Sequence, residues 1–138
     1  LDGKTAVGDA SLGTANSWTK PQRGNMKDLG STVNGNLDLT SISSTDEFSN
    51  YTNFKGVLSG ATTMKNFTIA SAMVGQSGML RFQQDGTGGR EITWESKWVF
   101  PEGTKTVTTT GNAYNNYVYF VEDTSRITVV PLKDVKAS

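Results

Sequence analysis

The segment from Gln83 to Trp94 constrains the fold of this chain more than any other stretch. Leu80 and Phe82 alternate with polar residues before it, and Ile92 and Trp94 alternate in the same way at its end. Between the two runs, an Asp-Gly-Thr-Gly-Gly sequence supplies residues that accept positive φ at little steric cost. This order of strand, glycine turn and strand predicts a β-hairpin and, with it, an all-β domain.

Turn signals recur along the rest of the chain about every 8–12 residues, a spacing typical of β-sandwiches and barrels. No segment keeps helical apolar spacing for three turns, and the nearest candidate, residues 45–54, is rich in Ser, Asn and Thr. We therefore expect an all-β fold, an antiparallel β-sandwich or barrel-like domain over residues 25–138. It should contain a Thr-rich strand at residues 105–110 and a closing hairpin that pairs residues 117–122 with residues 126–132.

Residues 1–24 differ in composition from the rest of the chain. They are rich in Gly, Ala, Ser and Thr, show no sustained periodicity and contain one large anchor, Trp18. We interpret them as an extended N-terminal arm or linker that precedes a single β-domain. Leu1 in first position is compatible with processing or with truncation, and neither a signal-peptide pattern nor an internal repeat is evident.

Charge and missing residue types exclude several classes of function. The 13 basic and 13 acidic residues cancel, which argues against nucleic-acid binding and against a polybasic membrane-surface binder. No apolar run approaches the roughly 18 residues of a membrane span. Because cysteine and histidine are both absent, thiolate or imidazole metal sites and the usual serine triad are excluded, and we expect no metal and no cofactor.

Two motifs resemble parts of enzymes, and both have a simpler interpretation. The glycines of residues 86–89 are similar to a phosphate loop, but such a loop opens a helix and here a β-type run follows. The acidic residues Asp85, Glu91, Glu95 and Glu102 could supply the paired carboxylates of a glycosidase, yet nothing in the sequence shows a pair. We interpret them as a turn and as solvated charges, and we predict that the chain is not an enzyme.

The tryptophans admit two interpretations. Trp94 and Trp98, with Phe100, either fill a core or a subunit interface, or form a platform on which sugars stack. Packing is favoured because large apolar rings are mostly buried. We expect Trp94 and Trp98, together with Trp18, to contribute to assembly.

A second aromatic group lies near the end of the chain, at Tyr114, Asn115, Asn116 and Tyr117. It combines aromatic faces with amide donors and acceptors, which is typical of an adaptable contact surface, although a plain loop can have the same composition. These four residues and Asp85, on its glycine turn, are the candidate binding residues.

An ordered series of turns and strands carries a family resemblance. Its parts are Gly75-Gln76-Ser77-Gly78, the Gln84–Arg90 turn, Thr93-Trp94 and Trp98–Thr104, preceded by Trp18–Gly24. In this order they resemble a β-rich domain of tailed-bacteriophage tail-fibre, receptor-binding and head-decoration proteins, over residues 18–129. The resemblance implies a non-enzymatic component of the virion surface, often trimeric, whose partners are other capsid or tail proteins.

Two classes of function stay open on this basis. The first is a structural virion protein, a head-decoration (cement) subunit or a fibre domain, whose arm drapes over a neighbour. The alternative is a host-surface-binding adhesin tip that recognises a glycan or surface protein through residues 114–117. In either class, assembly as a homo-oligomer, a trimer by the resemblance, would protect exposed sheet edges. A third class, a glycan-cleaving enzyme, is disfavoured by the missing histidine and the unpaired carboxylates.

Overall fold

The structure, a computed structural model, describes residues 25–41, 47–105 and 107–136, and most of its regular secondary structure is β-strand. The proposed arm, residues 1–24 with Trp18, lies outside the described residues. The elements, in chain order, are β1 (Met26–Asp28), β2 (Val33–Leu37), α1 (Glu47–Asn50), β3 (Asn53–Met64), η2 (Ser71–Met73), β4 (Ser77–Gln84), β5 (Ile92–Trp94), β6 (Trp98–Val99), η3 (Pro101–Gly103), β7 (Tyr114–Asp123) and β8 (Arg126–Leu132). The all-β prediction is confirmed.

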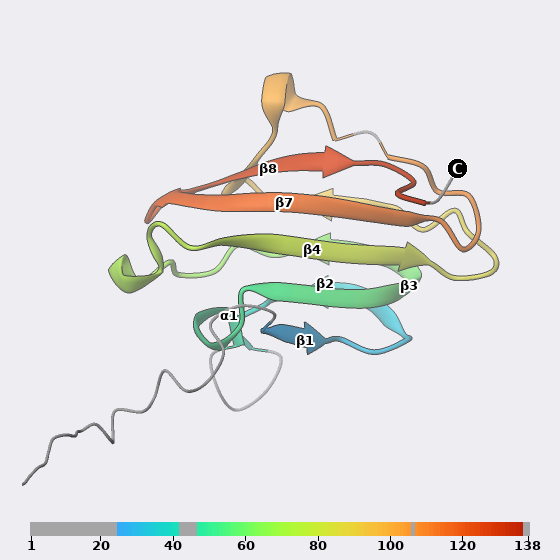
Figure 1. Cartoon of the computed structure of the whole chain (residues 1–138), viewed down its shortest axis with the longest axis horizontal. Coiled ribbons are helices and arrows are strands. Elements are labelled where there is room, and N and C mark those ends of the chain that lie inside the picture. Colours follow the sequence, from blue (N-terminus) through green and yellow to red (C-terminus); the bar gives the residue numbers. More distant parts are fainter. Residues whose placement is uncertain (1–24, 42–46, 106, 137–138) are drawn as a thin grey trace, which may run out of the picture.

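The strands form one continuous sheet that folds into two layers, because β3 is 12 residues long and belongs to both. The first half of β3 lies between β1 and β4, and its second half lies between β2 and β5. β7 and β8 continue the front layer beyond β4, while the rear strands show as fainter ribbons behind them (Figure 1).

Three parallel rungs stack like the coils of a solenoid. β1 with β2, the two halves of β3, and β4 with β5 each run along the front layer and continue along the rear layer. The register aligns Met26 with Asn53 and Asn53 with Met79, so the chain returns to the same place after 27 residues and then after 26. The rungs share strand register rather than residue types, which is why no repeat is evident in the sequence.

The strand pairing differs from the antiparallel arrangement that we predicted. β4 pairs with β7 and β7 pairs with β8 in antiparallel fashion, whereas the other pairings among the described residues are parallel. The predicted closing hairpin is confirmed as β7 and β8. The predicted opening hairpin is wrong, because β4 lies beside β3 and β7 in the front layer while β5 pairs with the rear half of β3.

The glycine segment after β4 is a corner between the layers rather than a hairpin turn. Asp85 accepts hydrogen bonds from the Gly88 N–H at 3.0 Å and from Arg90 Nη2 at 2.8 Å. The buried Gln84 amide exchanges hydrogen bonds of 2.8 and 2.9 Å with the Arg90 backbone. Gly88, with φ 74°, approaches Thr109 so closely that a Cβ atom would lie 2.5 Å from the Thr109 carbonyl oxygen. A strand follows this corner instead of a helix, so the segment lacks the helix that a phosphate loop requires.

Aromatic and aliphatic side chains fill the space between the layers. Trp94 of the rear layer packs on Tyr117 of the front layer, with ring centroids 4.9 Å apart. Trp98 and Phe100 pack against Trp94 at 5.5 and 5.0 Å. The packing interpretation of these rings is confirmed, but Trp94 and Trp98 are buried inside the chain. The assembly role that we expected for them therefore has no exposed surface through which to act.

Two further segments differ from their predictions. Of the expected Thr-rich strand, the described residues 105 and 107–110 belong to no strand. The weak helix candidate at residues 45–54 contains the one-turn helix α1. Phe48 explains this turn, since its ring is fully buried and lies 4.8 Å from that of Phe67. Burial of one large ring outweighs the poor helix propensity of its polar neighbours.

Candidate functional site

The front layer has one buried and one exposed face, and β7 shows how its side chains divide between them. Successive residues of a strand point to opposite faces. Tyr117 and Tyr119 are buried against the core, whereas Val118 and Phe120 are exposed. The exposed side, called here the outer face, is the side of the sheet that can meet another molecule.

The alternation divides the four residues predicted at 114–117. Tyr114 and Asn116 belong to the outer face, while Asn115 and Tyr117 point inward and are each 1% exposed. The Asn115 amide donates to the Thr108 carbonyl at 2.8 Å and accepts from the Asp134 N–H at 3.0 Å. Burial raises the pKa of the Tyr117 phenol. Asn115 and Tyr117 therefore hold the fold together. Of the four residues only Tyr114 is exposed on the outer face, and Asn116, although its side chain is on that side of the strand, is buried.

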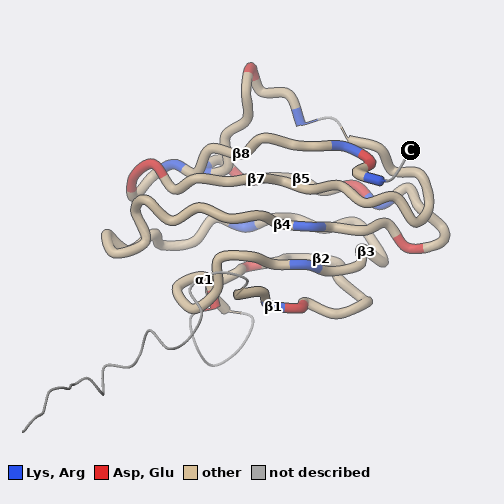
Figure 2. The backbone as a smooth tube through the Cα atoms, viewed as in Figure 1, with Lys and Arg blue, Asp and Glu red and all other residues tan. Residues whose placement is uncertain are grey.

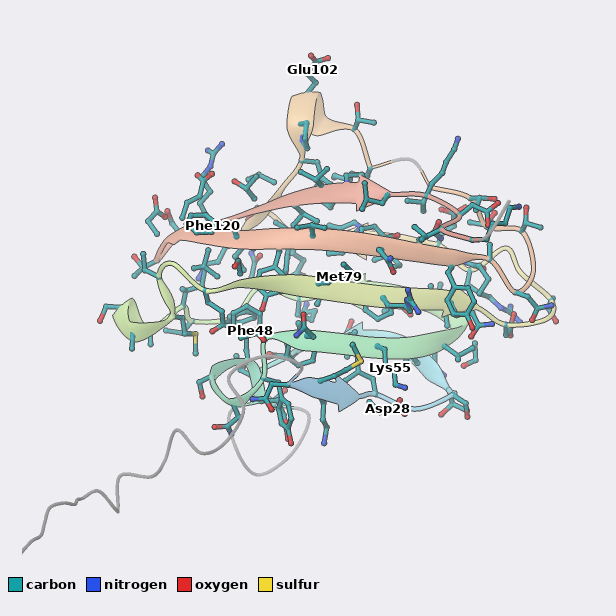
Figure 3. The ribbon with its side chains drawn as sticks, viewed as in Figure 1. Asp28, Phe48, Lys55, Met79, Glu102 and Phe120 are labelled. Carbon is teal, nitrogen blue, oxygen red and sulfur yellow. The ribbon has the colours of Figure 1, made fainter. Side chains whose placement is uncertain are left out.

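The outer face carries a row of polar residues across four adjacent strands. Strand register aligns Asp28 with Lys55, Lys55 with Arg81, and Arg81 with Asn116. We call this row the charged ladder. Asp28 and Lys55 lie side by side on neighbouring strands in Figure 3, and their charged atoms are 4.0 Å apart. Both side chains are half-exposed or more, so this ion pair is weak.

Two contacts fix the position of Arg81 in the charged ladder. Its Nε donates to the side-chain oxygen of Asn116 at 3.0 Å. Its guanidinium carbon lies 5.0 Å from the centre of the Tyr114 ring, within the range of a cation–π contact. The two Nη nitrogens form no hydrogen bond and no ion pair with any residue in the described ranges. Arg81 is therefore an ordered cation without an acidic partner in that part of the chain.

A groove of about 460 Å³ runs beside the charged ladder, and we call it the ladder groove. The turn after β1 contributes to its lining, and in this turn Gly30 has φ 92° and donates its N–H to Asp28 at 2.9 Å. Its polar and aromatic lining includes Asp28, Ser31, Lys55, Arg81, Gln83 and Tyr114. A concave site with a few convergent polar groups is the usual form of a small-molecule or saccharide site.

The beginning of β7 and the end of β4 thus meet in one site that we predicted only in part. Tyr114 and Asn116 were among the candidate residues, whereas Lys55 and Arg81 were missed. Their signal was present in the sequence, since each is a single cation inside an otherwise apolar strand segment, Phe54-Lys55-Gly56 and Leu80-Arg81-Phe82. Only the strand register brings the two cations together.

Beyond the charged ladder, the outer face becomes apolar. Val118, Phe120, Val130 and Leu132 of β7 and β8 are each at least 40% exposed. Figure 2 shows charged segments on β1, β3 and β4, whereas the middle of β7 and of β8 carries none. We call these four residues the apolar patch. Exposed apolar groups gathered on one surface are typical of a place where another protein binds.

Asp85, the remaining candidate, is occupied inside the corner. Its hydrogen bonds with Arg90 and with the Gly88 N–H hold the pKa of this carboxyl below its usual range. A second cavity, of about 450 Å³, lies nearby and is lined by Arg90, Glu91, Lys105 and Trp94, among others. Within the described ranges there is no group of three or more metal-binding side chains. Nor does any described helix have the length and apolar character needed to cross a membrane.

Comparison with known proteins identifies a family. The chain matches the family described as "Putative phage tail fibre C-terminal domain" over residues 18–116. No curated protein and no solved structure matches it. The match contains the whole charged ladder and ends at Asn116, before the apolar patch begins at Val118. It covers most of the chain and agrees with the resemblance seen in the sequence. The chain therefore belongs to the phage tail fibre C-terminal domain family.

Proposed function

We propose that this chain is the host-contacting domain of a phage tail fibre and that it binds the bacterial surface through the ladder groove. Family membership makes the chain a structural component of the fibre, associated with the virion. Family membership favours a role in the fibre over a role in head decoration. The observation that supports a binding role is Arg81, an ordered cation that borders a groove and has no acidic partner among the described residues.

The lining of the ladder groove suits a polar ligand. Arg81, Lys55 and Gln83 supply donors, and Asp28, Gln83 and Ser31 supply acceptors. The aromatic ring of Tyr114 is 37% exposed and fixes the guanidinium of Arg81 in place. A saccharide presents hydroxyl groups that both donate and accept hydrogen bonds, so it matches this mixture better than an apolar ligand does.

Cell binding by the intact chain tests this function. The labelled chain should bind cells of a strain that the phage infects, and Tyr114→Ala and Arg81→Gln should each weaken binding. Arg126→Gln is a matched control, because Arg126 is a half-exposed arginine at the far end of β8 and pairs with Glu122 at 2.9 Å. Unchanged cell binding by both groove variants would remove the ladder groove from consideration.

The apolar patch favours a second role, assembly with other copies of the chain. An antiparallel sheet with one face in water usually alternates apolar and polar residues, but β7 carries Val118 and Phe120 on its outer side. We propose that this half of the outer face packs against a second copy, in a homo-oligomer that the resemblance suggests is a trimer. Sedimentation of the intact chain tests this role, which a purely monomeric distribution at micromolar concentration would refute.

A further inference from the structure

We infer that the ladder groove selects saccharides that carry an oxyanion, a carboxylate or a phosphate, and that Arg81 binds this group. The inference rests on the proposed function, since it names the chemical class of the ligand at the same site. It depends on three features of the groove. They are the Nη end of the Arg81 guanidinium, the contact of this guanidinium with the Tyr114 ring, and the distribution of charge along the charged ladder.

The first feature is the orientation of Arg81. Asn116 is 4% exposed, and its side-chain oxygen engages the Nε of Arg81 at 3.0 Å. This contact leaves the end of the guanidinium that carries both Nη nitrogens without a partner among the described residues. Two parallel N–H groups at that end match the two oxygens of a carboxylate or a phosphate. Asn116 is thus a positioning residue for the cation.

The contrast with Arg90 shows that an arginine beside a cavity in the described part of the chain need not be arranged in this way. Arg90 also borders a cavity, but its Nε and Nη2 engage both carboxylate oxygens of Asp85, at 2.8 to 3.2 Å. Its charge is satisfied inside the chain. Arg81 has an amide and an aromatic ring as neighbours, which fix its position and leave its charge uncompensated.

The second feature is the ring of Tyr114. The Arg81 guanidinium lies over this ring, 5.0 Å from its centre. One face of the ring, which a neutral sugar could otherwise use for stacking, is therefore occupied by a cation. Recognition at this point depends on the charge of Arg81 more than on a flat aromatic platform.

The third feature is the sequence of charges along the ladder. Lys55 is on the strand next to Arg81, about 4.8 Å away in the sheet, and adds a second cation. Asp28 follows on the next strand and places a negative charge at the end of the groove. An anionic group is favoured beside Arg81 and Lys55, while a second anion near Asp28 is repelled. The ligand that fits is a saccharide with isolated oxyanions rather than a densely charged polymer.

A titration of the intact chain followed by amide NMR tests the inference. The probes are a galacturonic-acid trisaccharide, a phosphorylated galactose trisaccharide and a neutral galactose trisaccharide. We expect saturable shifts at the amides of Lys55, Arg81 and Asn116 with at least one acidic probe. The neutral probe should bind at least ten times more weakly, and the better acidic probe identifies carboxylate or phosphate as the preferred oxyanion.

Substitutions of Arg81 distinguish the effect of the guanidinium geometry from the effect of positive charge alone. Arg81→Gln should weaken binding of the acidic probe by about ten- to hundred-fold, the usual range for a lost charge-assisted hydrogen bond. Arg81→Lys keeps the charge without the bidentate geometry and should fall between Arg81→Gln and the intact chain. Arg126→Gln removes the same charge from the other end of the sheet and should bind as the intact chain does. Well-dispersed amide spectra of each variant show that the fold is kept.

Several outcomes overturn the inference. They are equal binding of acidic and neutral probes, no saturable shift with any probe, shifts scattered over the surface, or Arg81→Gln binding like the intact chain. The proposed function fails separately, when the intact chain does not bind susceptible cells or when the groove variants bind them unchanged. If cell binding needs Tyr114 and yet no acidic probe is preferred, the function stands and the ligand class is wrong.

Discussion

The outer face of the front layer has two halves that are built in different ways. The polar half crosses β1, β3 and β4, which are parallel and belong to successive rungs. The apolar half is centred on the outer side of the β7–β8 hairpin, and the register continues it from Val118 to Met79 of β4 and, through Asn53, to the exposed Met26 of β1. Parallel rungs align residues that are about 26 positions apart in the sequence, such as Lys55 and Arg81, whereas a hairpin aligns residues that are near one another, such as Val118 and Val130.

This difference separates two kinds of surface on one sheet. Each rung contributes a single side chain to a row that crosses the rungs. One substitution in a rung therefore alters one position of that row. The charged ladder is such a row, and it lies within the family match. The apolar patch is a local property of one hairpin and lies beyond the end of that match. A substitution in the charged ladder can thus leave the apolar patch unaltered.

The largest expected effects test whether the two halves share one core. Phe54 lies under the polar half and Ile127 under the apolar half, and both are buried. We expect Phe54→Ala to lower the free energy of unfolding by about 3–5 kcal/mol and Ile127→Ala by about 2–5 kcal/mol. Denaturant unfolding should show one cooperative transition in each variant. Two separate transitions would mean that the halves fold as independent units.

The next largest effect concerns the apolar patch. Phe120→Asp and Val130→Asp together should weaken the proposed self-association by at least about a hundred-fold. Each of the two side chains would lose roughly 1.5–3 kcal/mol of favourable burial in the interface. Sedimentation velocity over a range of concentrations measures this loss. Val74→Asp is a matched control, since Val74 is 42% exposed but lies just beyond η2, outside the sheet. Equal weakening by the control would mean that added charge, and not the patch, drives dissociation.

The sequence allowed the strands to be predicted better than their partners. Alternation of apolar residues located β4, β7 and β8, and positive φ at Gly88 and Gly89 agrees with the predicted glycine conformation. Alternation states which face a residue occupies, but it does not state which strand lies beside it. The parallel pairing of Met26, Asn53 and Met79 depends on long-range register, which leaves no local signal.

The same reasoning explains the partial success at the site. The run from Tyr114 to Tyr117 was rightly noticed as aromatic and polar, but a strand sends alternate residues to opposite faces. That rule alone, applied to a strand at this position, would have separated Tyr114 and Asn116 from Asn115 and Tyr117. Arg81 could not have been added, because its place beside Asn116 follows from the β4–β7 register.

A smaller effect on stability is expected from substitution of two tyrosines that lie on opposite sides of β7. The buried Tyr119 hydroxyl donates to the Thr52 carbonyl at 2.7 Å and accepts from the Gln76 amide at 3.0 Å. Tyr119→Phe should lower the free energy of unfolding by about 1–3 kcal/mol, because it leaves the Thr52 carbonyl unpaired. Tyr114→Phe removes a hydroxyl that bonds to no described residue and should change stability by at most about 0.5 kcal/mol. Similar losses in both variants, measured by denaturant unfolding, would contradict the assignment of the two faces.

The smallest expected effect is a loss of stability in acid, to which one carboxylate in the corner after β4 and one in the β7–β8 turn should contribute. In the corner after β4, Arg90 and the Gly88 N–H lower the pKa of Asp85, and in the β7–β8 turn the backbone and hydroxyl of Ser125 lower the pKa of Asp123. Each folded-state pKa lies below the unfolded value, so each ionised carboxylate stabilises the fold above about pH 4. This contribution is lost as the pH falls through the folded-state pKa.

Asp85→Asn and Asp123→Asn should therefore be less stable than the intact chain near neutral pH and should lose less stability on acidification. Thermal unfolding midpoints measured from neutral pH to below about pH 3 give both quantities. Because Asp123 is exposed and Asp85 is only half-buried, water screens both charges, and the shifts should be small and should add in the double variant. If only one variant loses less stability than the intact chain on acidification, only that carboxylate contributes to the acid sensitivity of the fold. If neither does, these turn carboxylates contribute nothing to the acid sensitivity of the fold.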